Sequence, residues 1–157
     1  MRVRPLGPED VDTLRAIRLE ALRSDPDAFG TTLAREEART EDEWRAWIGR
    51  GATFVAEDEV GPSGLIVAVP QEGRRVVGIF AMFVSARARR QGVGRTLVEA
   101  AVEWATSQGA ERVELMVVQR NDAAASLYEA CGFAYTGQSE RRERDDAVEL
   151  EMARSLG

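Results

Sequence analysis

A short basic loop rich in glycine, residues 89–95, carries the residue types best suited to chemistry in this 157-residue sequence. Gly92 and Gly94 have no Cβ, so a ligand oxygen can approach the backbone closely there. An apolar, β-branched run at 77–84 and an amphipathic pattern at 96–105 flank the loop, which predicts strand, loop and helix. The first turn of a helix has unpaired amides and the positive end of the helix dipole. The junction is therefore a candidate site for phosphate or another anion.

Arginines surround the same turn and add positive charge; they are Arg87, Arg89, Arg90 and Arg95. A tight turn with solvated arginines is the alternative that this stretch alone leaves open. A P-loop is excluded, because that motif needs a glycine five positions before Gly94 and a lysine after it. Arg89 and Arg95 occupy those two places.

A second group of motifs follows the predicted helix. It consists of Asn121 after an apolar strand pattern, Leu127-Tyr128-Glu129 on a further helix, and Gly132-Phe133 at the end of that helix. Together with the loop Arg89-Arg90-Gln91-Gly92-Val93-Gly94, this ordered set resembles the GCN5-related N-acetyltransferase family. That family carries an R/Q-x-x-G-x-G/A loop and, further on, an asparagine and Leu-Tyr-Glu before Gly-Phe. The resemblance is sharp over residues 76–137 and weaker elsewhere.

The resemblance implies an α/β fold in which a mixed, mostly antiparallel sheet is flanked by helices, with residues 1–157 forming a single domain. It also implies an acetyl-CoA-dependent N-acetyltransferase that moves the acetyl group to a primary amine of a small molecule or peptide by direct attack. In the family, the loop amides bind the coenzyme A pyrophosphate, and the preceding strand pairs with the pantetheine arm. The cofactor-binding positions carried over are Met82, Phe83, Val84, Arg89, Arg90, Gln91, Gly92, Val93, Gly94, Arg95, Thr96, Asn121 and Ser126.

Tyr128 occupies the motif position at which the family has its general acid. A phenol with a pKa of about 10 can donate a proton to a thiolate whose conjugate acid has a pKa of about 8.5. A core tyrosine with a satisfied hydroxyl is the alternative. Asn121 contacts the pantetheine arm in the family, and it is also placed to cap the helix that carries Tyr128. Cys131 is expected to be a small buried residue.

The general base is not evident from the sequence. Many family members have a glutamate on the strand before the loop, whereas this chain has only apolar residues at 80–84. The candidates for the general base are a water chain and four carboxylates, namely Glu36, Glu37, Glu57 and Glu114. Glu114 would have to face the cleft although it alternates with core residues. This gap keeps open a second hypothesis, a non-catalytic acyl-CoA-binding sensor with the same fold.

The N-terminal third is the region that helps to form the acceptor pocket in the family. A strand at 2–6 and a helix from Pro8 to about Arg23 precede a stretch at 24–40 that is expected to be loop. Thr40 and Glu43 then match a capping box for a second helix. The candidate acceptor contacts are Phe29, Glu36, Glu37 and Trp47. A solvated acidic loop beside a packing helix is the alternative for each of them.

The remaining pattern completes a β-rich order. It predicts strands at 53–56, 65–69, 76–84, 111–118, 133–138 and 147–153, the last with clear alternation of apolar and acidic residues. The charged stretch 139–146 is expected to be a mostly solvated hairpin loop.

The composition narrows the function classes. A net charge of −6 argues against non-specific nucleic-acid binding, the third hypothesis for the arginine loop, and mildly favours a cationic acceptor. With no histidine and one cysteine, the chain cannot form an internal disulfide and is not expected to hold a metal. We find no secretory signal and no membrane-spanning run, and so expect a cytoplasmic protein without a membrane partner. A homodimer is an open alternative, because dimers are frequent in the family.

Overall fold

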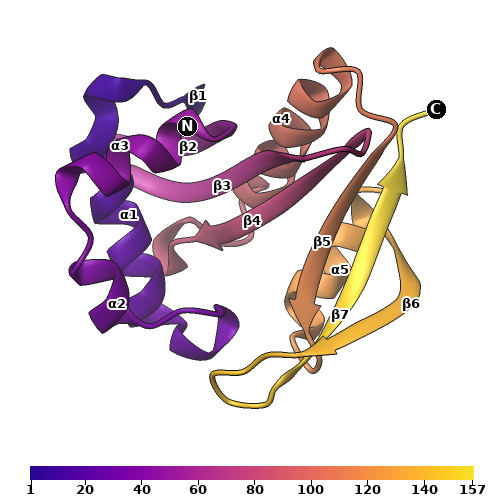
Figure 1. The fold of residues 1–157 in the computed structure, drawn as a ribbon. Coiled ribbons are helices and arrows are strands. Elements are labelled where there is room, and N and C mark those ends of the chain that lie inside the picture. Colours follow the sequence, from indigo (N-terminus) through magenta and orange to yellow (C-terminus); the bar gives the residue numbers. More distant parts are fainter.

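One seven-stranded sheet runs through the computed structural model, which describes residues 1–157, in the order β1-β2-β3-β4-β5-β7-β6 (Figure 1). Neighbouring strands are antiparallel except β4 and β5, which are parallel. The mixed, mostly antiparallel sheet predicted from the family resemblance is thus confirmed. The strands are β1 (Arg2–Pro5), β2 (Ala52–Glu57), β3 (Pro62–Gln71), β4 (Val76–Val84), β5 (Arg112–Val118), β6 (Ala134–Arg141) and β7 (Val148–Ser155).

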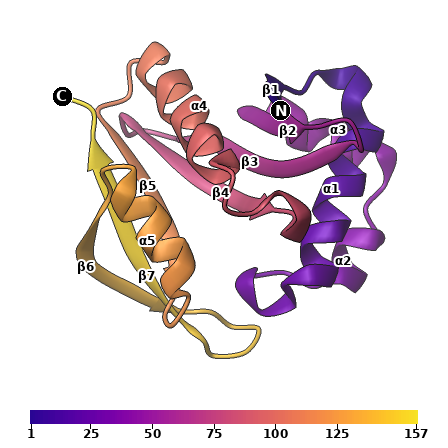
Figure 2. The ribbon, with the colours of Figure 1, turned by 180° about the vertical axis from the view of Figure 1, so that it is seen from behind.

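Five α-helices cover the two faces of this sheet. They are α1 (Val11–Ser24), α2 (Leu33–Glu37), α3 (Glu41–Gly49), α4 (Val93–Ser107) and α5 (Asp122–Ala130). Helices α4 and α5 lie on one face, which is turned toward the viewer in Figure 2, and α1 to α3 lie against the other face beside β3 and β4. No helix is long and apolar enough to cross a membrane.

Each face of the sheet has its own apolar core. Leu97, Val98 and Ala101 of α4 pack on one face with alternate residues of the strands, such as Ile66 and Val113. Leu14, Ile17 and Trp44 pack on the opposite face with the intervening strand residues Val55, Leu65 and Val67. The alternation of side chains along a strand explains why neighbouring residues serve different cores.

The sheet opens into a V between β4 and β5. The two strands pair from Val76↔Arg112 to Ile79↔Leu115, and no pairing follows. Strand β4 nevertheless continues to Val84, and β5 continues to Val118. Residues 80–84 therefore have neighbours only on β3, so their other edge is free to pair with an extended ligand.

A β-bulge in β4 accompanies the opening. Leu65 of β3 pairs with Phe83 and Val67 pairs with Phe80, so β4 has one more residue than β3 in this interval. Ala81 lies in the left-handed region at φ 57°. A bulge bends a strand and redirects its side chains, and it lies here at the point where β4 leaves β5.

Two segments differ from the loops predicted by sequence. The stretch at 24–40 contains α2, which Thr32 caps by accepting a hydrogen bond from the Arg35 amide. Five residues are too few to show helical periodicity, so the pattern missed this helix. Within the predicted loop 139–146, β6 extends to Arg141, and Arg142 is buried. The capping box of Thr40 and Glu43 is confirmed.

Candidate active site

A cleft of about 1370 Å³ occupies the V between the two arms of the sheet. Its walls come from the end of β4, the start of α4, the β5–α5 junction, the α1–α2 loop and the β6–β7 loop. Among the sequence-predicted cofactor positions, those that line the cleft are Met82, Phe83, Val84, Arg89, Arg90, Gly92, Val93, Gly94, Arg95 and Asn121. The fold thus brings together the two motif groups that the sequence places about 30 residues apart.

The start of α4 presents a row of unused amides to this cleft. The first amide of the helix that donates to the protein is that of Thr96, to the Gly92 carbonyl at 3.1 Å. The amides of residues 90–95 donate to no protein atom. Gly92, at the N-cap, has φ 79° and no side chain to cap the helix. An anion would complete both the amide hydrogen bonds and the favourable interaction with the helix dipole.

The surroundings of Gly94 leave no room for a side chain. A Cβ at this position would lie 3.0 Å from Leu127 Cδ2 and 3.2 Å from Met82 Cε. A larger residue at this position would therefore displace Leu127 and Met82, which line the cleft.

The arginines of the loop are differently engaged. Arg87 is tied to Asp58 at 3.0 Å and to the carbonyls of residues 61 and 62, which makes it a structural residue. Arg89 donates to the Val84 carbonyl and pairs with Asp25. Arg95 pairs with Glu99, one turn along α4, in an exposed ion pair. Arg90, at φ 64°, has no ion-pair partner, so it is the loop arginine most available to a phosphate.

Non-glycine residues with positive φ gather at this site. Ala81, Arg90 and Arg120 have φ values of 57°, 64° and 84°, and all three line the cleft or the adjoining gap between β4 and β5. Such conformations each cost roughly 1–3 kcal/mol and concentrate at functional sites.

Tyr128 lies on α5. It lines an apolar gap of about 120 Å³ between β4 and β5, which adjoins the cleft. Its ring packs against Phe133 with centroids 6.0 Å apart. The hydroxyl has no hydrogen-bond partner in the protein. Burial raises the pKa of Tyr128 well above its usual range, so the phenol keeps its proton and is available as a hydrogen-bond donor.

Three predicted cofactor positions do not line the cleft. Gln91 donates from its side chain to the Arg87 carbonyl, and Thr96 donates from its hydroxyl to the Gly92 carbonyl. These bonds hold the shape of the turn. Ser126 lies exposed on α5. Asn121 lines the cleft and also caps α5 through a bond from the Ala124 amide, so the structure allows both roles considered for it.

Of the four candidate acceptor residues, the structure brings only Phe29 to the cleft. Glu36 is 1% exposed and bonds to Arg18 and Arg39. It belongs to a buried ion-pair cluster, not to a solvated acidic loop. Glu37 is exposed and lies 3.9 Å from Arg23, and Trp47 packs beside Trp44.

The other carboxylates considered as a base are also engaged. Glu57 pairs with Arg4 at 2.6 Å. Glu114 pairs with Arg74 and Arg112 on the face of β5 that lies away from α5. An ionised carboxylate held by arginine is a poor proton acceptor, because the arginine stabilises its charged form.

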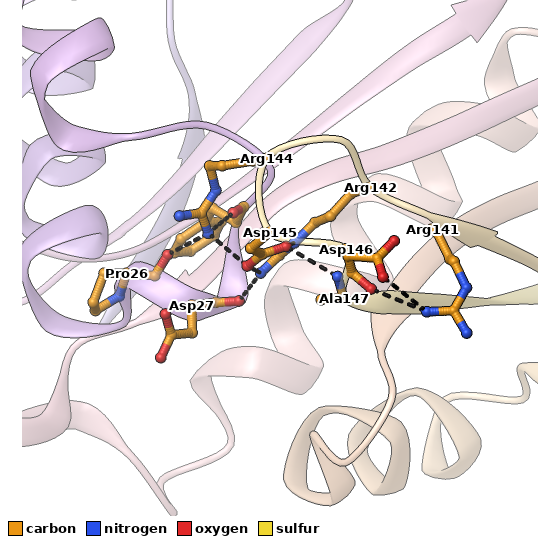
Figure 3. A network of polar contacts seen from close by, with 9 residues as sticks. Pro26, Asp27, Arg141, Arg142, Arg144, Asp145, Asp146 and Ala147 are labelled. Atoms are coloured by element: carbon orange, nitrogen blue, oxygen red, sulfur yellow. Dashed lines mark hydrogen bonds and ion pairs between the residues drawn. The ribbon is translucent and has the colours of Figure 1, made fainter.

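Two loops from opposite arms of the V meet at the far end of the cleft, where sequence analysis had indicated solvated residues. Arg142 donates to the Asp27 carbonyl, and Arg144 donates to the carbonyls of Pro26 and Phe29 at 3.1 and 2.9 Å (Figure 3). Asp145 binds Arg142 through both oxygens, at 2.7 and 2.8 Å. We call this contact of Arg142, Arg144 and Asp145 with residues 26–29 the loop latch.

The loop latch holds Phe29 in place. Its carbonyl accepts from Arg144, and the Arg18 guanidinium lies 4.9 Å from the centroid of its ring. Arg142 keeps the pKa of Asp145 well below its usual range. The side of the cleft formed by Phe29 is therefore already ordered before any acceptor binds.

This arrangement is that of the GNAT fold. The structure of YncA from Salmonella typhimurium, solved with its cofactor acetyl-CoA, superposes with a TM-score of 0.83 over 100% of this chain and 94% of that one, at 17% identity. The acetyltransferase of the GNAT family from Streptococcus pneumoniae superposes with a TM-score of 0.81 over 99% of both chains, at 25% identity.

Sequence comparison agrees with the fold. The profile of the acetyltransferase (GNAT) family matches residues 15–133, and the chain belongs to that family. N-acetyltransferase 8 of Homo sapiens is 35% identical over 95 residues, which are 57% of this chain and 42% of the human protein. The chain thus spans about two fifths of the length of this curated relative.

Proposed function

We propose that the protein is an acetyl-CoA-dependent N-acetyltransferase that acetylates a primary amine of a small molecule or peptide. The observation that carries this proposal is the free edge of β4 leading directly to six unused amides at the start of α4. The free edge suits an extended pantetheine arm, and the amides suit a diphosphate. Both features of coenzyme A are matched in the order in which the ligand presents them.

When bound, acetyl-CoA supplies a thioester as the acetyl donor. The residues assigned to hold it are those of the loop 89–95, Met82 to Val84 of β4, and Asn121. The unpaired edge of β4 offers a backbone amide to the thioester carbonyl, which would stabilise the negative charge that develops there. Tyr128 donates its proton to the leaving sulfur from the α5 side of the gap.

The acceptor approaches from the other side of the sheet. Helices α4 and α5 lie on one face of the sheet (Figure 2), and the cofactor enters from that face. The acceptor amine then enters from the opposite face, where Phe29 and the β6–β7 loop form the wall of the cleft. Acceptor and donor then meet in the gap between β4 and β5. A cytoplasmic location is part of the proposal; the single cysteine, which is buried, suits a reducing compartment.

Calorimetric titration with coenzyme A and thiol release from acetyl-CoA across a panel of primary amines test the proposal. We expect binding together with amine-dependent thiol release. Binding without release on any amine would instead support an acyl-CoA sensor, and absence of binding would overturn both functions.

A further inference from the structure

Glu149 on β7 is a half-buried carboxylate without a partner. Residues Leu150 and Met152 pack toward the core beneath α4 and α5, so the alternation along the strand turns Glu149 to the opposite face. That is the face from which the acceptor approaches. Glu149 forms no ion pair or hydrogen bond, unlike its neighbour Glu151, which bonds to Arg112 and Thr136.

The strand register pairs Glu149 with a residue of the cleft wall. Glu149 lies directly opposite Val118 of β5, a residue that lines both the cleft and the gap. On its other side it lies directly opposite Glu140 of β6, which also has no ion-pair partner. Like charges at directly opposed positions destabilise a sheet, and a bound ammonium group would relieve this repulsion.

Arg142 lies next to Glu149 on the same face. The Arg142 amide donates to the Ala147 carbonyl, which makes Arg142 a diagonal cross-strand neighbour of Glu149. The Arg142 side chain is 7% exposed, and Nε and Nη2 are bound within the loop latch. Nη1 is buried and has no partner, although Arg142 lines the cleft. A buried donor without a partner is costly, which points to an oxygen supplied by a ligand.

We propose that Glu149 accepts the proton of the acceptor amine and that Arg142 donates from Nη1 to an oxygen close to that amine, so that the acceptor is an α-amino acyl compound. In such a compound the ammonium nitrogen is attached to the carbon atom next to a carbonyl carbon. This arrangement is present in free amino acids and at peptide N-termini. The inference rests on the proposed acetyltransferase function and adds the substrate class and the base.

The proton balance is complete with these groups. Glu149 takes a proton from the amine, directly or through one water, and the nitrogen forms its bond to the acetyl carbon. The carbon–sulfur bond breaks, and Tyr128 protonates the sulfur from the opposite side of the gap. Burial raises the pKa of Glu149 above its usual range, Arg142 opposes this shift, and Glu140 and Asp145 add to it. A higher pKa makes a carboxylate a better proton acceptor near neutral pH.

Matched amines test the substrate class. The apolar lining of the gap favours an apolar side chain, so we choose L-leucinamide, L-leucylglycine, free L-leucine and 3-methylbutylamine, which has the same skeleton without the carboxyl carbon. Rates are expressed per concentration of neutral amine, because these amines differ in pKa. We expect kcat/KM for leucinamide or leucylglycine to exceed that for 3-methylbutylamine by at least about tenfold. Preference for leucinamide and leucylglycine over leucine would identify a peptide N-terminus, and the reverse would identify an amino acid.

Two pairs of variants test the residues. Glu149→Gln should lower kcat for leucinamide by about 100-fold or more, whereas Glu140→Gln, on the opposed strand, should lower it far less, because it removes only a neighbouring charge. The wild-type kcat should fall as the pH drops through the raised pKa of Glu149, and Glu149→Gln should lack this acid limb. Arg142→Lys should abolish the preference for leucinamide over 3-methylbutylamine. Arg144→Lys, which weakens the same loop latch, should keep that preference. Thermal unfolding of each variant verifies that it is folded.

The outcomes separate this inference from the proposed function. Wild-type protein that binds acetyl-CoA but acetylates 3-methylbutylamine as well as leucinamide, or neither, would overturn the substrate class and leave the cofactor site intact. A Glu149→Gln variant with an unchanged kcat and only a higher KM would overturn the role as base. Absence of acetyl-CoA binding would overturn the proposed function itself, before any amine is compared.

Discussion

Tyr128 and Glu149 divide the proposed proton transfers between the two sides of the gap between β4 and β5. Tyr128 comes from α5 and is held neutral by burial, whereas Glu149 faces the acceptor side and has no arginine bound to it. Burial keeps Tyr128 protonated, as a general acid must be, and it raises the pKa of Glu149, so that the ionised carboxylate is a stronger proton acceptor. Sequence motifs indicated Tyr128, but no motif marks Glu149.

Replacing the Tyr128 hydroxyl tests the acid directly. Tyr128→Phe keeps the ring that packs on Phe133, so the fold and coenzyme A affinity should be retained. We expect kcat to fall by about 10²-fold or more, because general acid catalysis typically contributes that much. Steady-state kinetics and calorimetry on the same preparation measure both quantities. A variant with the wild-type kcat would show that water or another group protonates the sulfur.

The alkaline side of the pH profile gives a second test at this scale. In the proposed mechanism the acid form of Tyr128 is the active one, and burial raises its pKa above the ordinary value of 10.0. Loss of activity through its ionisation should therefore begin only above about pH 10. We expect kcat to stay on its plateau from about pH 8 to 10 with a fully neutral acceptor amine. A decline centred near pH 8 to 9 would contradict the assignment.

The elements that matter most are β4 and α4, which are joined by the glycine loop. The bulge at Ala81 and the loss of pairing after Ile79 free the edge of β4, and the loop brings the amides at the start of α4 to the end of that edge. The glycines and arginines of this loop were visible in the sequence. The number of unused amides could not be seen in the sequence, because it depends on which hydrogen-bond acceptors the folded chain places near them.

Gly94→Val tests the close contact between these elements. The new side chain would begin 3.0 Å from Leu127 Cδ2 and 3.2 Å from Met82 Cε, so it must displace these two residues of the cleft wall. Overpacking costs about 1–3 kcal/mol, and we expect coenzyme A affinity to fall by at least about tenfold. Calorimetric titration measures the loss. Gly49→Ala is the control, since a Cβ there meets nothing within 4 Å. Undiminished affinity in a folded Gly94→Val variant would contradict the assigned pyrophosphate site.

At the scale of the whole molecule, the loop latch joins the two arms of the open sheet. Arg142 reaches the Asp27 carbonyl across 115 residues of sequence, and Arg144 bonds to the carbonyls on either side of it, at Pro26 and Phe29 (Figure 3). Because β4 and β5 do not pair at this end, the loop latch provides a connection that the sheet lacks.

Arg144→Ala should loosen this connection without touching the cofactor loop. Loss of two hydrogen bonds from a charged group that is partly exposed should lower the free energy of unfolding by about 1–2 kcal/mol, which corresponds to a melting temperature lower by about 2–8 °C. Amide exchange at residues 26–29 should become faster, and the KM for the acceptor should rise. Coenzyme A affinity serves as the internal control. Unchanged exchange at residues 26–29 would show that the bonds of Arg144 do not restrain the α1–α2 loop.

The sequence by itself determined the order of most elements, the family and the glycine loop, and it supplied the prediction for Tyr128. Glycines at a turn, a capping box and apolar periodicity depend on residues within a few positions of one another, so they are legible along the chain. The short helix α2 was not predicted, because five residues are too few to show a helical period.

Only the tertiary structure decided which charged side chains are free. Glu36 and Glu149 are both glutamates, and Glu149 stands between the apolar residues Val148 and Leu150 in the sequence. Glu36 is nevertheless the one that is buried between two arginines, whereas Glu149 has no ion-pair partner. The charged stretch 139–146 likewise became a loop latch because the carbonyls it binds lie on the opposite arm. A charged group is stabilised or left available by whatever distant group the fold brings within a few ångströms, and spacing along the chain carries no record of that.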